Sequence, residues 1–469
     1  MAWVVQLEEI IDGKVVGRSK IATLDRPGKL ESLDDLGLRL ADAKPLLANI
    51  QAEVVSRQIA HDAEQRSRCA DCGKHRRLKD YRPRQFDTLF GRIEVRVPRF
   101  DGPDCGCDDA SIQNAAPSAL SGRSTPEYDA MRAKLAAQLP YRVAAELLAD
   151  LLPVSGGATH TTVRNRTFTV AETITAQGSE RAAAGKAEQP ARALTLQLDH
   201  TYIRAAANEG SRHLQVLAGE IEPDGGGSRR RFASLADSSE CPPIVREHLE
   251  QSGYHPHTSL TVLTDGDEGL RNIARAASDG PIVVILDWFH LAMRLRPLEQ
   301  LAQGLRTRVP THRAAKEKII DALEHLHWRL WHGKLDALGE CYEQVRVAIR
   351  AFRRHTKGAR MSTGPRALMT GLHELKQYIA NNASTLIDYH RRQKAGLRVS
   401  SCGAESTVNC LVNRRMNKSQ QMRWSRRGAD LLLQVRAAVL NGEFDVLARP
   451  GSVSHAANEE EYDLLPLAA

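Results

Sequence analysis

Two apolar, strand-like runs that each lead into an aspartate constrain the fold of this chain most. Leu194–Leu198 leads into Asp199, and Leu260–Thr264 leads into Asp265. A third acidic residue, Glu405, follows 140 positions after Asp265. Two aspartates at strand ends and a distant glutamate supply the oxygen ligands with which a sheet can hold two divalent metal ions against a phosphodiester.

Further strand-like runs surround these two. His213–Ile221 and Arg231–Leu235 predict two strands joined at the glycines 225–227, and Pro243–Glu250 predicts a helix. Pro281–Leu286 is apolar on both faces, as in a strand buried between helices, and leads into Asp287. The order β-β-β-α-β-α-β predicts an α/β fold with an RNase H-like mixed sheet, in which carboxylates at the tips of the first and fourth strands face each other.

Each acidic residue also has an ordinary structural explanation. An aspartate directly after a strand often caps a turn or the next helix. Asp267 and Glu268 are expected in the first turn of the following helix, where negative charge is favoured. Asp287 and His290 can be hydrogen-bonded packing at a helix start, and Glu405 alone would be a solvated helix residue.

Four of the eight cysteines form two close pairs. Cys69 and Cys72 make a C-x2-C knuckle, and Cys105 and Cys107 make a tighter C-x-C pair. The alternating runs around Gly91 predict a β-hairpin between the pairs, which would bring four thiolates together as a structural zinc ribbon. Free thiols in a reducing compartment are the alternative, and the one-residue gap of the second pair departs from the usual knuckle.

Residues 126–172 have a helical pattern. Tyr141–Leu152 reads as an amphipathic helix, a break follows at 153–157, and hydroxyl residues at 159–162 can cap a second helix. Two helices around a short turn fit a helix-turn-helix reader of the DNA major groove, and an ordinary helical hairpin gives the same pattern. The candidate DNA contacts on the second helix are Thr162, Arg164, Asn165 and Arg166. Residues 176–191 read as a linker.

Positive charge is concentrated in one region. Residues 291–430 hold 27 Lys and Arg against 11 Asp and Glu, a net charge of +16, whereas the whole chain carries +8. Such a region is typical of a polyanion-binding surface, most simply for nucleic acid, although solvated helix faces give the same count. Arg414, Arg415 and Lys418, which follow Glu405, suit a helix lying along DNA.

The long separation of Asp265 and Glu405 predicts a helical insertion in the core. Residues 314–331 and 338–353 have helical patterns. Trp328 and Trp331 share one face of such a helix; they either pack in its core or stack on an unpaired base.

The composition is globular: 42% of the residues are hydrophobic and 26% are charged. No stretch approaches the roughly 18 uninterrupted apolar residues of a membrane span, and the N-terminus lacks a basic, apolar signal peptide. These features lead us to expect a soluble intracellular protein without a membrane partner. The family resemblance described next implies a cytoplasmic, nucleoid-associated bacterial location.

Taken together and in this order, the motifs resemble the DDE transposases of bacterial insertion sequences, most closely the ISKra group. The resemblance covers nearly the whole chain. It rests on the cysteine knuckles, the carboxylates, Asp287-Trp288-Phe289-His290, the segment 403–409 and the segment 420–425.

The resemblance implies that Asp199, Asp265 and Glu405 are the catalytic triad and hold two Mg²⁺ ions, with Mn²⁺ as a possible substitute. Asp287 and His290 match an accessory D-x2-H element. The implied reaction is cleavage of element ends and strand transfer into double-stranded target DNA, by a homo-oligomer in a synaptic complex. The alternatives are a transposase-derived DNA-binding regulator without catalysis and an RNase H-like nuclease that cuts without joining.

The predicted organisation has seven parts. In order, they are an N-terminal region (1–65), a zinc ribbon (66–110), a helix-turn-helix region (120–175), the first part of the core (192–290), a helical insertion (291–398), C-terminal core helices with Glu405 (399–442) and a tail (443–469).

Overall fold

The computed structural model describes residues 1–29, 31–69, 72–101, 122–154, 159–184, 191–235, 239–307, 309–355, 363–400, 407–418 and 422–448. In these residues the chain is a mixed α/β protein, so the predicted fold class is confirmed at that level. It divides into two compact units, Met1–Ile174 with the stretch from Glu443, and Thr175–Gly442.

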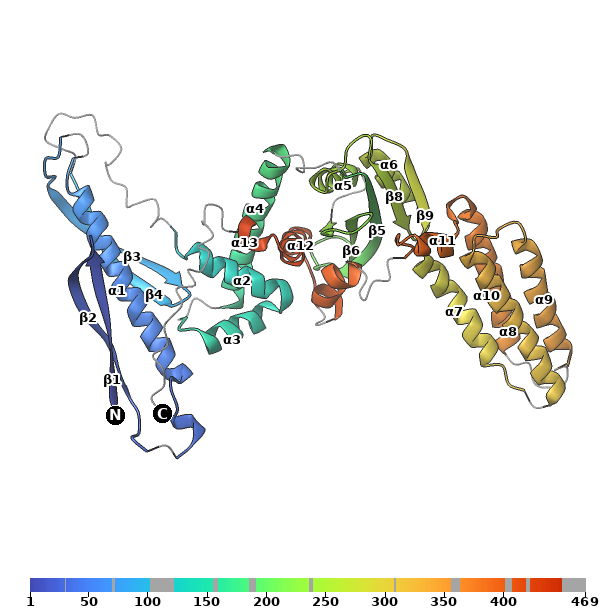
Figure 1. Ribbon diagram of the computed structural model, residues 1–469, viewed down its shortest axis with the longest axis horizontal. Coiled ribbons are helices and arrows are strands. Elements are labelled where there is room, and N and C mark those ends of the chain that lie inside the picture. Colours follow the sequence, from blue (N-terminus) through green and yellow to red (C-terminus); the bar gives the residue numbers. More distant parts are fainter. Residues whose placement is uncertain are drawn as a thin grey trace. The chain divides into compact units, whose positions relative to one another are not determined.

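The first unit begins with two hairpins and a long helix (Figure 1). Strands β1 (Ala2–Ile11) and β2 (Lys14–Asp25) pair antiparallel. Asp12 and Gly13 both have positive φ at their turn, as a tight two-residue hairpin turn requires. Helix α1 (Leu40–Arg66) contacts β2 and also β4 of the second hairpin, β3 (Leu78–Thr88) and β4 (Gly91–Phe100). The predicted hairpin around Gly91 is confirmed.

Helices α2 (Pro126–Gln138) and α3 (Tyr141–Leu151) follow, and α4 (His160–Ala184) begins in this unit. The two helices predicted on either side of 153–157 are thus present as α3 and α4. Because α4 runs on to Ala184, the linker predicted from residue 176 is wrong over 176–184, where the alanines extend the helix. The short helix α13 (Phe444–Leu447) closes the unit.

The second unit is built on a five-stranded sheet in the order β7-β6-β5-β8-β9. Strands β5 (Ala193–Arg204), β6 (His213–Pro223) and β7 (Arg230–Ser234) are antiparallel neighbours. Strands β8 (Ser259–Thr264) and β9 (Ile282–Leu286) continue the sheet parallel to β5. With α5 (Cys241–Gln251) and α6 (Glu268–Ala277), they confirm the predicted order β-β-β-α-β-α-β.

Strand β5 is longer than the sequence pattern indicates. Its pairing with β8 ends at Gln197 and Leu263, whereas its pairing with β6 continues through Asp199 to Arg204. Asp199 therefore lies inside β5, at the point where the parallel neighbour stops. The continuation 200–203 contains Thr, Tyr and Ile, which favour strands.

The two faces of the sheet have different coverings. Leu194, Leu196 and Leu198 face a buried core shared with α5 and α6. Helix α12 (Arg426–Leu440) packs on β7, and the π-helix η5 (Asn409–Lys418) contacts β5, β7 and α12. Gly219 of β6 lets the ring of Phe232 approach: a Cβ at that position would lie 2.2 Å from the ring.

A helical bundle is inserted after β9 (Figure 1). It consists of α7 (Trp288–Gln303), α8 (Pro310–Trp331), α9 (Leu338–His355), α10 (Thr363–Asn381) and α11 (Tyr389–Lys394). The helices predicted at 314–331 and 338–353 are therefore present. In α8 the buried residues recur every three or four positions, so one face of the helix lies in the bundle core.

Candidate functional site

The acidic residues predicted at strand ends gather at one edge of the sheet. Asp265 directly follows β8 and Asp287 directly follows β9, while Asp199 lies two residues beyond the last β5–β8 pair. The Asp287 N–H donates to the Thr264 carbonyl at 2.8 Å, which joins the ends of β8 and β9. In α/β sheets, ligands bind at the carboxyl ends of the parallel strands.

A small pocket opens at this edge. Asp199, Asp287 and His290 line it together with Thr407 and Val408, which begin the segment after the core insertion. Asp265 does not line it directly. Glu405 lies outside the described residues, but Thr407 follows it by two positions. The remaining residues of the pocket wall come from the strands: Gln197, Leu198, Ala218 and Leu263.

Asp199 is in an unfavourable place for a lone negative charge. Burial raises the pKa of its carboxyl above the ordinary value; nearby His290 acts against this rise, and the charge of Asp265 adds to it. The Asp199 carboxyl is thus poorly hydrated and lies near a second carboxylate, so a cation would stabilise its charged form.

Asp287 is buried and has a structural role. One of its carboxylate oxygens accepts a hydrogen bond of 2.8 Å from the N–H of Phe289, which caps α7. The other oxygen lies 3.7 Å from His290 Nε2. Asp287 and His290 therefore fix the start of α7, which forms one wall of the pocket. The cap agrees with the expectation that an aspartate directly after a strand caps the next helix.

The turn that carries Asp265 is held by the helical bundle. The hydroxyl of Tyr378, on α10, donates to the Asp265 carbonyl at 2.5 Å, and Asn382 lies against Gly266. Arg271 donates to the Gly266 carbonyl at 3.0 Å and also to the Asn382 side-chain oxygen. Burial raises the pKa of Tyr378 to about 12, so its hydroxyl stays protonated as a donor.

No pattern in the sequence identifies Tyr378 or Asn382, because a helix residue 113 positions from its partner carries no local signal of that contact. Asp267 and Glu268, by contrast, lie at the start of α6, where the sequence predicts them: Glu268 is in the first turn, and Asp267 directly precedes it as the N-cap, with its side chain accepting from the N–H of Gly269.

The described residues contain no group of three or more His, Cys, Asp or Glu side chains placed to hold a metal ion. At the sheet edge they bring together Asp199 and Asp265, and the third expected ligand, Glu405, is outside them. The donors present are carboxylate oxygens, the hard ligands that Mg²⁺ prefers.

The first cysteine pair forms a tight knuckle. The N–H of Gly73 donates to the Cys69 carbonyl at 2.9 Å, the N–H of Cys69 donates to the Lys74 carbonyl at 2.8 Å, and Gly73 has φ +71°. Cys69 is buried and Cys72 is exposed. Cys105 and Cys107 lie outside the described residues. The N–H of Asp101 donates to the Arg77 carbonyl at 2.9 Å, so the chain leaves β4 beside the point where it enters β3.

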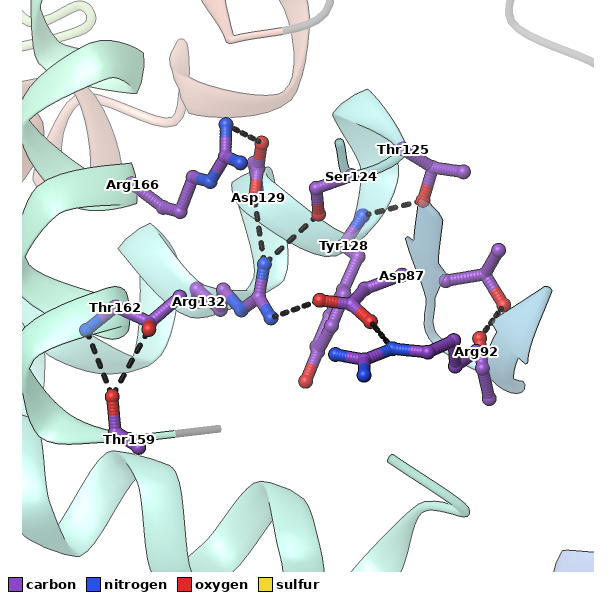
Figure 2. A network of polar contacts seen from close by, with 12 residues as sticks. Asp87, Arg92, Ser124, Thr125, Tyr128, Asp129, Arg132, Thr159, Thr162 and Arg166 are labelled. Atoms are coloured by element: carbon purple, nitrogen blue, oxygen red, sulfur yellow. Dashed lines mark hydrogen bonds and ion pairs between the residues drawn. The ribbon is translucent and has the colours of Figure 1, made fainter. Parts of the chain in front are cut away.

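The start of α4 is capped as the sequence predicts. The Thr159 hydroxyl accepts from the Thr162 N–H at 3.2 Å and lies 3.0 Å from the Thr162 hydroxyl (Figure 2). Arg164 and Asn165 are exposed on one face of the helix. Arg166 turns instead toward Asp129, with 3.6 Å between Nη1 and Oδ2.

A buried arginine of α2 connects that helix to the second hairpin, β3–β4. Arg132 is fully buried; it donates to Ser124 and Asp129 at 2.9 Å, and its guanidinium lies 3.5 Å from the centre of the Tyr128 ring (Figure 2). It also lies 3.9 Å from a carboxylate oxygen of Asp87 on β3. Because a buried guanidinium requires such partners, this network fixes α2 on the hairpin.

The three basic residues after Glu405 are not equivalent. Arg414 is exposed. Arg415 is 1% exposed, and its guanidinium lies 5.4 Å from the centre of the Trp424 ring, so it packs inside the unit in place of the expected DNA contact. The side chain of Lys418 lies outside the described residues.

The two tryptophans of the insertion also differ. Trp331 packs edge-on against Trp288 at 4.7 Å in the bundle core, as the core interpretation predicts. Trp328 is 43% exposed and stacks on His332 at 4.3 Å.

Comparison of this chain with protein-family models gives no match, and comparison with curated proteins gives none either. In the part of the chain that the structure describes, no helix combines the length and apolar character needed to cross a membrane.

Gly266→Ala tests the importance of the Asp265 turn. Gly266 has φ +101°, and an added Cβ would lie 2.7 Å from the Asn382 side-chain oxygen. We expect a lower free energy of unfolding, by about 2–3 kcal/mol, from backbone strain and the forced shift of Asn382. Urea denaturation measures it.

Gly210→Ala is the matched control, because Gly210 has φ +70° with nothing within 4 Å of the added Cβ. It should show only the strain, about 1 kcal/mol. Equal losses for both variants would contradict a tight Asp265 turn.

Proposed function

We propose that this protein is a DDE transposase with an RNase H-like core. The sheet order β7-β6-β5-β8-β9, antiparallel on one side of β5 and parallel on the other, is the arrangement expected for such a core. The observation that carries the proposal is that Asp199 and Asp265 follow adjacent parallel strands at the same end of the sheet, where Asp199 lines a pocket that Thr407 of the C-terminal segment also lines.

Glu405 is the proposed third carboxylate. Thr407 lines the pocket beside Asp199, and two residues of extended chain reach at most about 7 Å. Covalent geometry therefore supports a role for Glu405 at this edge of the sheet, although the glutamate is 140 positions from Asp265 in the sequence.

As hard oxygen donors, Asp199, Asp265 and Glu405 would hold Mg²⁺. When bound, two such ions activate the attacking oxygen and stabilise the leaving oxygen of a phosphodiester. The chain's own contribution is to hold the carboxylates in register: β5 carries Asp199, while Tyr378 and Asn382 fix the turn of Asp265. Asp287 and His290 orient the pocket wall.

Two surfaces are proposed to bind double-stranded DNA. The exposed face at the start of α4, with Arg164 and Asn165, suits a major groove, where Arg reads guanine and Asn reads adenine. Residues 291–430, with their net charge of +16, suit the phosphate backbone, and the exposed Arg414 belongs to them. Assembly of at least two chains on paired element ends follows from the resemblance alone.

Zinc is the second proposed metal. In the sequence, Cys69 and Cys72 precede β3, and Cys105 and Cys107 follow β4. The hydrogen bond from the Asp101 N–H to the Arg77 carbonyl joins the end of β4 to the start of β3. A hairpin with cysteine pairs at its base is the arrangement of a structural zinc ribbon.

The alternatives are distinguished by chemistry. A transposase-derived regulator would bind DNA without needing Asp199, Asp265 or Glu405, and all three are present. A nuclease of the same fold would cut but not join strands. Products in which element ends are linked to target DNA separate the two enzymes.

Asp265→Asn tests the catalytic assignment. It removes one negative charge with little change of shape, so Mg²⁺-dependent cleavage of DNA carrying the element ends should fall by about 10³-fold or more, while DNA binding stays within about twofold. Gel analysis of cleaved ends and a binding titration measure the two effects. Asp267→Asn, two positions away, is the control and should still cleave; wild-type cleavage by Asp265→Asn would remove the aspartate from the site.

Arg164→Ala tests the proposed recognition helix. If Arg164 contacts a base edge, binding to element ends should weaken by about 1–3 kcal/mol while binding to unrelated DNA changes little. Asn165→Ala should act similarly. Arg166→Ala is the internal comparison: its ion pair with Asp129 predicts an effect on stability with a smaller effect on DNA specificity. Undiminished specificity in Arg164→Ala would exclude this face of α4.

Metal analysis of the purified full chain tests the ribbon. We expect about one zinc per chain, lost in Cys72→Ser because a structural site needs all four ligands. Cys410→Ala, which changes a cysteine without ligand spacing, should retain it. A zinc-free wild-type protein would contradict the ribbon.

A further inference from the structure

An exposed arginine lies beside the turn of Asp265 and has no role in the site described above. Arg294 is on α7, whose start carries Asp287 and His290. Spacings of three and four residues place Asp287, His290 and Arg294 on one face of the helix. Because His290 lines the pocket at the sheet edge, Arg294 lies one turn further along the same face of α7.

Tyr378 holds this guanidinium in place. The central carbon of the Arg294 guanidinium lies 4.0 Å from the centre of the Tyr378 ring, and the hydroxyl of the same ring donates to the Asp265 carbonyl at 2.5 Å. A guanidinium that lies over an aromatic ring keeps N–H donors available at its edges. The Tyr378 side chain thus links a positive charge to the turn that carries Asp265.

Three other arginines of this unit serve the fold. Arg271 donates to the Gly266 carbonyl, Arg398 forms ion pairs with two carboxylates of β6, and Arg415 is buried. Among the residues that the structure describes, no carboxylate forms an ion pair with Arg294. Its charge is therefore available to a ligand.

A groove runs along the bundle from this arginine. Helices α7 and α10 lie side by side (Figure 1), and a cavity of about 600 Å³ opens between them. Its charged lining residues are Arg294, Arg366 and Glu374, and most of its other walls are apolar. Positions 366, 370, 374 and 378 share one face of α10, so the groove leads from Arg366 to the contact of Arg294 with Tyr378.

We propose that Arg294 binds a backbone phosphate of the DNA strand whose reacting phosphodiester lies at the edge of Asp199 and Asp265, and that the groove between α7 and α10 receives this strand. The inference rests on the proposed function and deepens it by naming a substrate-binding residue. Carboxylates at the edge repel a phosphodiester, whereas Arg294 attracts it. Its planar fork matches two phosphate oxygens, and Tyr378 holds the fork in place.

Arg294→Met is the variant to test, because Met removes the charge and keeps an unbranched stem that packs on Tyr378. Arg294→Lys keeps the charge and loses the planar fork. Arg296→Met is the matched control: Arg296 is also exposed on α7, but it points to a different side of the helix. All three variants should keep the Tm of the wild type, because both arginines are exposed.

The salt dependence of DNA binding reports how many phosphates the protein neutralises. For duplex DNA carrying the element ends, without added Mg²⁺, the slope of log Kd against log[KCl] should fall by about 1 in Arg294→Met. It should stay near the wild-type value in Arg294→Lys and in Arg296→Met. A wild-type slope in Arg294→Met, or an equal loss in Arg296→Met, would overturn the proposal.

A neutral methylphosphonate, placed at one position of the DNA at a time, locates the phosphate. At the bound position it should weaken wild-type binding by about 10-fold, the usual cost of a lost hydrogen bond to a charged group. In Arg294→Met the same substitution should cost little more, because both changes remove one contact. Equal losses in the two proteins at every position would contradict a phosphate bound by Arg294.

The cleavage rate separates this inference from the proposed function. With Mg²⁺ and saturating DNA, Arg294→Met should cleave about 10-fold more slowly than the wild type, because the reacting phosphate is held less well against the acidic edge. A wild-type rate would overturn the place of Arg294 beside that phosphate. Absence of cleavage by the wild type in Mg²⁺ or Mn²⁺ would end the proposed function, and the salt slope and the methylphosphonate series would still decide whether Arg294 binds a phosphate.

Discussion

The parallel pairing of β5 with β8 is the interaction on which the candidate site depends. Its register places Gln197 beside Leu263, so Asp199 and Asp265 follow at the same level beyond the last pair. A shift by one residue would turn Asp199 to the face occupied by Leu198 and bury the carboxylate among the apolar residues under α5 and α6. The leucines of β5, which precede Asp199 and face the apolar core, therefore fix the face of the sheet on which the aspartate lies.

The helical bundle and the C-terminal segment complete the edge that this pairing begins. Tyr378 and Asn382 hold the turn after β8, and Asp287 starts α7, the first helix of the bundle. In the C-terminal segment, the Thr407 hydroxyl donates a hydrogen bond to Glu220 of β6. The bundle therefore contacts the strand ends both through the start of α7 and through the end of α10.

In the first unit, a buried charged residue also holds separate elements together. Arg132 connects α2 with β3 through Asp129 and Asp87, and Asp129 in turn pairs with Arg166 of α4. Arg164 and Asn165, also on α4, are exposed. Within that unit, Arg132 and Arg166 thus support the fold through ion pairs with Asp129.

The sequence by itself determined the order of strands and helices around the core, the hairpin at Gly91, the capped start of α4 and the aspartates that follow β8 and β9, because these depend on local periodicity and capping. It did not determine that β5 continues past Asp199, that Arg415 is buried or that Trp331 belongs to the core while Trp328 is exposed. Only the tertiary structure decided the contacts of Tyr378 with Asp265 and of Thr407 with Glu220. The partners are 113 and 187 positions apart, and no local pattern encodes a contact over such separations.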